Sequence, residues 1–136
     1  MTVTAIDTSV AVPLLVGTHP AHGLTTAWRK NRELVLSGHA LAETYSVLTR
    51  LPGDLRATPE QAATIISKEF QAPIALGATR FGRLLETLSA AGVAGGAAYD
   101  ALVALAAVEH DLELATRDAR ARPTYEAVGA RVAVVG

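Results

Sequence analysis

Short apolar segments of strand length alternate with segments of helical character along this chain. The strand-length segments are 2–6, 33–36, 73–76, 112–116 and 131–135. This alternation predicts an α/β fold, in which a central, mainly parallel sheet of about four or five strands is flanked by helices in a three-layer arrangement. We expect one domain spanning residues 1–136, because the length suits one core and the sequence contains no linker, repeat or low-complexity tract.

Start signals mark some of the predicted helices. Thr58 is followed by Pro59 and, three residues after the threonine, by Gln61, a pattern typical of a capping box. Ser9 is expected to cap a first helix that ends near residue 16. Further helices are predicted at about 24–30, 38–51, 58–70, 81–88, 97–108 and 119–128.

Four acidic residues fall where such a fold would place them at one end of the sheet. Asp7 and Asp118 directly follow or lie just beyond strand-like runs, while Glu43 and Asp100 lie early in predicted helices. Carboxyl ends of parallel strands and amino ends of the following helices share one edge. The helix and strand between Asp100 and Asp118 advance roughly 15 Å and return about 16 Å. We therefore expect the four carboxylates to converge.

Each acid, taken alone, has a simpler structural explanation. Asp7 and Asp100 suit helix amino ends, Asp118 could cap the helix after it, and Glu43 could be a surface glutamate. These explanations leave the low charge density around Asp100 and Asp7 unexplained. Burying unpaired carboxylates is costly, so a metal ion would be a natural compensator. Ligation by oxygen alone indicates magnesium or manganese rather than zinc.

The composition limits the compartment and the partners. Cysteine is absent, which excludes disulfides and thiolate metal sites and fits the reducing cytoplasm. The longest apolar stretch, 101–108, is too short to span a bilayer, so we expect a soluble cytoplasmic protein with no membrane contact. With a net charge of −1, any contact with nucleic acid must be local. Arginines cluster at 29–32 and at 117–122.

Together these fragments resemble the PIN domain family, and specifically the VapC-type toxins of bacterial type II toxin–antitoxin pairs. The resemblance covers nearly the whole chain. It is carried, in order, by Ile6–Ser9, Ala42–Tyr45, Tyr99–Leu102 and Ala115–Asp118. Each fragment is a weak signal alone, whereas four in this order form a fairly specific one.

The resemblance implies a Mg²⁺-dependent endoribonuclease, with Mn²⁺ as a substitute, that hydrolyses RNA by a metal-activated water. The catalytic and metal-binding residues would be Asp7, Glu43, Asp100 and Asp118. Thr8, Ser9 and Thr116 would be polar supports near them. Arg117 could hold a neighbouring phosphate or pair with one of the acids.

The resemblance also implies partners. VapC-type toxins pair with a small VapB-type antitoxin and form homodimers, which predicts a heterotetramer or larger assembly with the antitoxin. A mean hydropathy of +0.29 agrees with apolar helix faces left for such contacts. We expect the first helices to provide that surface.

Other functions fit the sequence less well. A receiver domain needs adjacent acids after its first strand, and a haloacid-dehalogenase-like phosphatase needs an Asp where Ser9 stands. A serine hydrolase would need a Gly-x-Ser-x-Gly elbow, which is absent. His19 and His22 are expected to be surface residues in a turn. A non-catalytic PIN-fold module that binds RNA or protein would keep all four acids, and this alternative stays open.

Overall fold

A four-stranded sheet lies at the centre of the computed structural model, which describes residues 1–136, and its strand order is β2-β1-β3-β4. The strands are β1 Thr2–Ile6, β2 Arg32–Leu36, β3 Leu114–Thr116 and β4 Val132–Val134. All three neighbouring pairs are parallel. The predicted α/β class with a mainly parallel sheet is therefore confirmed, with the acid-bearing strands β1 and β3 side by side.

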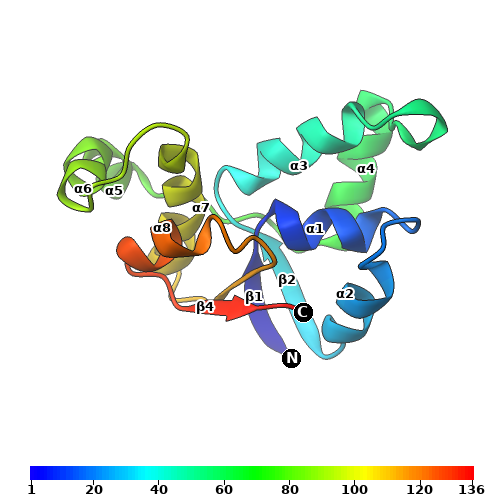
Figure 1. The fold of residues 1–136 in the computed structure, drawn as a ribbon, viewed down its shortest axis with the longest axis horizontal. Helices are drawn as coiled ribbons and strands as arrows, with labels where there is room; N and C mark the ends of the chain where they lie inside the picture. The colour runs from blue at the N-terminus through cyan, green and yellow to red at the C-terminus, as the bar shows by residue number, and fades with distance from the viewer.

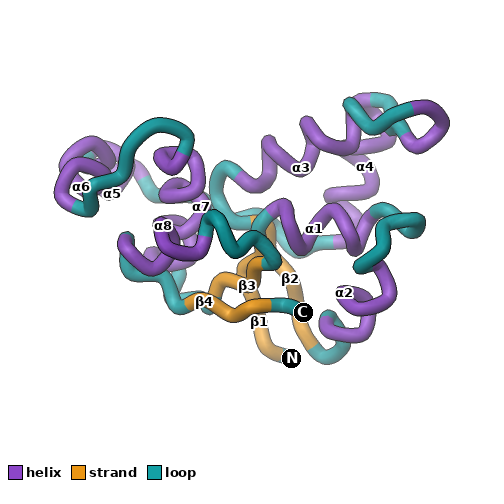
Figure 2. The backbone as a smooth tube through the Cα atoms, viewed as in Figure 1, coloured by secondary structure: helices purple, strands orange, loops and turns teal.

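Helices connect and cover these strands. They are α1 Thr8–Leu15, α2 His22–Trp28, α3 Ala40–Thr49, the 3-10 turn η1 Gly53–Leu55, α4 Pro59–Glu69, α5 Ala78–Gly82, α6 Leu84–Ala90, α7 Ala97–Glu109 and α8 Arg122–Ala127. The α3–α4 and α5–α6 pairs extend to opposite sides of the molecule (Figures 1 and 2). The capping box predicted at Thr58 and Gln61 is present at the start of α4. None of the helices combines the length and the apolar character needed to cross a membrane.

The core joins the sheet to the helices through small and medium-sized apolar side chains. It is a cluster of 21 buried residues. Ile6 of β1 and Leu114 of β3 are fully buried, as are Ala104 and Ala107 of α7. Alanines on the buried side of α7 add little volume, which lets α8 and the segment after β2 pack closely against this helix. The first turn of α7, which carries Asp100, is thereby held at the sheet edge.

A close contact between backbones fixes α3 relative to α7. Gly38, just before α3, has φ +55°, and a Cβ atom there would lie 2.5 Å from the carbonyl oxygen of Leu102 in α7. Next to it, the Ser37 hydroxyl donates a hydrogen bond of 2.6 Å to the Val103 carbonyl. Only glycine adopts this backbone conformation readily and leaves room for the helix. The helices that bear Glu43 and Asp100 therefore meet at Gly38.

Two predicted elements differ in the structure. The strand predicted at 73–76 is reduced to a single bridge between Ser37 and Ile74. Pro73 lacks the N–H that a longer ladder would use, which accounts for this. The helix predicted around 81–88 is divided into α5 and α6, neither of which has a buried residue. Without a packed face, a short segment has little to stabilise a continuous helix.

The predicted caps and starts of two helices also differ. Ser9 does not cap α1, because the helix begins at Thr8 with Asp7 in the capping position and no side-chain cap bond. The helix predicted from 119 begins only at Arg122. The carboxylate of Asp118 instead accepts hydrogen bonds from the backbone N–H groups of residues 120 and 121, which forms a turn before the helix.

Candidate active site

All four acids predicted to converge line one cavity of about 640 Å³. Asp7 directly follows β1, and Asp118 lies two residues beyond the end of β3. Asp100 is in the first turn of α7, and Glu43 is in the first turn of α3. The parallel sheet thus brings residues that are far apart in the sequence to one edge, as its topology requires.

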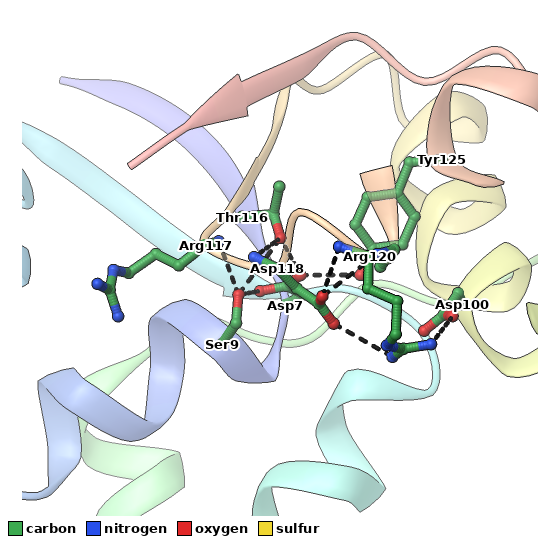
Figure 3. Close-up of polar contacts among 9 residues, drawn as sticks. Asp7, Ser9, Asp100, Thr116, Arg117, Asp118, Arg120 and Tyr125 are labelled. Carbon is green, nitrogen blue, oxygen red and sulfur yellow. Dashed lines mark hydrogen bonds and ion pairs between the residues drawn. The ribbon is translucent and has the colours of Figure 1, made fainter. Parts of the chain in front are cut away.

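Asp7 is the most buried of these acids, with 3% of its surface exposed. Its Oδ1 accepts a hydrogen bond of 2.5 Å from the Ser9 hydroxyl. Its Oδ2 accepts bonds from the Thr116 hydroxyl, at 2.5 Å, and from the Tyr125 hydroxyl, at 2.8 Å (Figure 3). Hydrogen bonds to an ionised carboxylate are strong and offset the cost of burying it. They also fix the direction in which Asp7 presents its remaining lone pairs.

Two of the three hydroxyls on Asp7, those of Ser9 and Thr116, are oriented by the backbone after β3. The N–H of Arg117 donates to the Ser9 oxygen at 2.7 Å, and the N–H of Asp118 donates to the Thr116 oxygen at 2.9 Å. Each hydroxyl accepts one bond and therefore has its single proton free for Asp7. The two predicted supports Ser9 and Thr116 thus contact Asp7 directly.

Thr8, the third predicted support, lines the cavity but makes its hydrogen bonds elsewhere. Its buried hydroxyl lies 3.2 Å from the Thr44 hydroxyl and 3.4 Å from the carbonyl oxygen of Ala40, both in α3. Thr8 therefore joins α1 to α3, which carries Glu43. Glu43 itself is exposed at the cavity wall.

One guanidinium group lies between two of the acids. Arg120 is 3.7 Å from Asp100 through Nη1 and 3.3 Å from Asp118 through Nη2 (Figure 3). Its side chain is 76% exposed, so it reaches the two carboxylates from the solvent side. Arg117 does not take the alternative role of pairing with one of the acids. It makes none of the ion pairs of the structure, and its side chain points away from the acids (Figure 3).

Two residues of the cavity have raised pKa values, and burial is the main cause of both shifts. Burial raises the pKa of Asp100 above its usual value of 3.8, Arg120 opposes this rise, and the charges of Asp118 and Asp7 add to it. Burial also raises the pKa of Tyr125 far above its usual range, and the charge and hydrogen bond of Asp7 contribute. Tyr125 therefore remains a hydrogen-bond donor throughout the ordinary pH range.

The acids of the cavity can be considered as ligands for a divalent metal ion. As the side chains lie here, no three His, Asp or Glu residues are grouped closely enough to enclose an ion. The chemistry of the four acids nevertheless fits Mg²⁺ or Mn²⁺, because they supply the carboxylate oxygens that these ions prefer. Asp100 and Asp118 already share one cation, the guanidinium of Arg120. The raised pKa of Asp100 indicates that further positive charge would be favourable there.

Sequence reasoning did not identify two residues that contact the acids. Arg120 belongs to an arginine cluster that was noted, but nothing in the sequence distinguished it from Arg117. Tyr125 lies in α8, where a tyrosine at helical spacing is typical of a core position. Its hydrogen bond spans 118 residues of sequence, so no local pattern could have indicated it.

Comparison with known proteins gives a consistent result. A model of the PIN domain family matches residues 4–127. Ribonuclease VapC27 of Mycobacterium tuberculosis is 58% identical over 130 residues, which cover 96% of this chain and 95% of that protein. Ribonuclease VapC40 of the same organism is 40% identical over 135 residues, which cover 96% and 98%.

The fold likewise resembles that of solved structures. VapBC2 from Rickettsia felis bound to a DNA fragment from its promoter superposes with a TM-score of 0.68, at 15% identity and over 98% of both chains. Identity this low supports the fold only, whereas the family match and the closely similar sequences extend over nearly the whole chain. The chain belongs to the PIN domain family and, within it, to the VapC proteins.

Proposed function

We propose that this protein is a Mg²⁺-dependent endoribonuclease and the toxin of a VapBC-type toxin–antitoxin pair. The observation that carries the proposal is the single cavity lined by Asp7, Glu43, Asp100 and Asp118. The names of its relatives, Ribonuclease VapC27 and Ribonuclease VapC40, support the reaction class. The carboxylates of Asp100 and Asp118, which share one cation in the guanidinium of Arg120, support the requirement for a divalent cation, with Mn²⁺ as a substitute.

Asp7 and Asp100 would hold the metal directly, and Asp118 and Glu43 would hold it directly or through water. When bound, the ion would lower the pKa of a water molecule for attack on a phosphodiester and would offset charge on the phosphate. Ser9, which donates to Asp7, would keep that carboxylate in one orientation. Because the Asp7 carboxylate is already fixed, it loses little conformational freedom when the substrate binds.

The two arginines nearest the acids have different proposed roles. Arg117 lines the cavity, points away from the acids and would contact a phosphate next to the scissile one. Arg120 would balance the charge of Asp100 and Asp118. Local cations of this kind are needed because the net charge of the protein, −1, does not attract RNA.

We further propose a VapB-type antitoxin as the partner, a homodimer of the toxin, and a heterotetramer or larger complex in the cytoplasm. A groove of about 420 Å³ supports the first helices as the partner surface. It runs from Leu15 at the end of α1 past Leu51 to Ile65 of α4, and apolar side chains form much of its lining. Co-purification with a short protein encoded beside the toxin, followed by mass measurement of the complex, tests these assignments.

The test of the reaction is cleavage of end-labelled RNA by the purified protein, with Asp7→Asn as the informative variant. We expect this variant to stay folded and to lose cleavage. Asp54→Asn is the matched control, because Asp54 is exposed and lies outside the cavity. Undiminished cleavage by Asp7→Asn would overturn the assignment. Binding of RNA without cleavage by the unmodified protein would instead favour the non-catalytic PIN-fold module.

A further inference from the structure

Two aromatic rings lie together at the wall of the cavity, next to the acids. The rings of His39 and Tyr99 have centroids 4.9 Å apart and an angle of 32° between their planes. His39 immediately precedes α3, and Tyr99 precedes Asp100 in α7. Both line the same cavity as Asp7. The pair therefore stands where a substrate would extend beyond the reacting phosphate.

The exposure of Tyr99 is not explained by the fold. The residue is 57% exposed, whereas the residues that pack α7 into the core are its alanines, valine and leucine further along the helix. Its hydroxyl makes no hydrogen bond with another part of the chain, unlike that of Tyr125, which donates to Asp7. The His39 ring packs against one part of the Tyr99 ring, and the rest of that ring is exposed to solvent. An aromatic surface held in place but left uncovered is suited to stacking with a planar ligand.

We propose that Tyr99, supported by His39, is a stacking platform for an unpaired nucleobase next to the scissile phosphate. This inference rests on the proposed ribonuclease function. Stacking of a base on an aromatic side chain tolerates every base, because each has a π-face, and it requires that the base be unstacked from its neighbours. The platform therefore selects single-stranded RNA or loops over duplexes. Arg117, which lines the same cavity, would contact the backbone of that strand.

Equilibrium binding separates this role from cleavage. The probe is a fluorescein-labelled RNA hexamer of mixed sequence, compared by anisotropy with a hexamer of abasic ribose phosphates, in the Asp7→Asn background with Mg²⁺. A gel verifies that the RNA stays intact. Tyr99→Ala is expected to weaken binding of the base-bearing hexamer roughly 5- to 100-fold, and to leave binding of the abasic one within about twofold. Tyr99→Phe, which keeps the ring, should restore the affinity.

Phe81→Ala is the matched control. Phe81 is also 57% exposed, but it lies in α5 and does not line the cavity. Its loss should leave both affinities unchanged. Thermal unfolding of each variant shows whether Tyr99→Ala has altered the fold.

Three outcomes would overturn the platform. They are equal affinity of the parent for the two hexamers, equal weakening of both by Tyr99→Ala, and an equal loss caused by Phe81→Ala. Failure of the unmodified protein to cleave any RNA is a different result. It would remove the proposed function, while base-dependent binding at Tyr99 would still be measured.

Discussion

Replacing Gly38 with alanine tests how the fold positions the site. At φ +55°, the new Cβ would lie 2.5 Å from the carbonyl oxygen of Leu102 and 3.1 Å from its carbonyl carbon. Both are backbone atoms of α7, so the clash cannot be relieved by turning a side chain. The left-handed conformation costs about 1–2 kcal/mol for a residue with a Cβ, and overpacking adds about 1–3 kcal/mol. We expect Gly38→Ala to lower the free energy of unfolding by about 2–5 kcal/mol.

Gly53 provides the matched control for this measurement. It has a similar φ of +58°, but a Cβ there would meet no atom within 4 Å. Gly53→Ala should therefore lose only the conformational part, about 1–2 kcal/mol. Urea unfolding followed by circular dichroism gives both values, and their difference isolates the close approach to Leu102. Equal losses in the two variants would show that the close approach of Gly38 to Leu102 does not stabilise the packing of α3 against α7.

Three further perturbations test the hydrogen bonds and charges of the cavity. Tyr125→Phe removes a donor from buried Asp7 and should cost about 1.5–3 kcal/mol in urea unfolding, whereas a change within error would show that the bond contributes little. The raised pKa of Asp100 means that the folded state holds its proton more tightly than the unfolded state, so stability should fall as pH rises from 3.8 through the folded pKa. Asp100→Asn should remove that part of the pH dependence of Tm measured in EDTA, and identical pH profiles would contradict the shift. Arg120→Ala should move this dependence to higher pH and lower Tm at neutral pH, because Arg120 lowers the pKa of Asp100; both changes should be small, since the arginine is 76% exposed.

The alternation of apolar segments was sufficient to predict the class of the fold and the edge at which the acids meet. Parallel strands leave few topologies open, and Asp7 and Asp118 are tied to strand ends by one and two residues of chain. The capping box at Thr58 could also be predicted, because it depends only on residues that are close in sequence. Local signals thus predicted the helices and strands, and the sheet topology predicted that the acids converge.

Features that depend on distant contacts were not accessible in this way. Ser9 resembles a helix cap in the sequence, but in the fold its hydroxyl accepts from the backbone N–H of Arg117, 108 residues away, and donates to Asp7. The division of the helix around 81–88 reflects missing tertiary contacts, which a pattern of leucines does not reveal. Tyr125 and Arg120 reach the acids only because the fold places α8 and the turn before it beside the cavity, which no local pattern indicates.

We propose that the carboxylates of this cavity make the protein a cation-dependent ribonuclease. The most direct test of this proposal is the rate of cleavage of end-labelled RNA by the purified protein as Mg²⁺ is titrated from EDTA-treated samples. We predict no cleavage in EDTA, recovery with Mg²⁺ or Mn²⁺, and no recovery for Asp100→Asn at any Mg²⁺ concentration. Cleavage that persists in EDTA, or that Asp100→Asn retains in full, would show that a cation held by these carboxylates is not required.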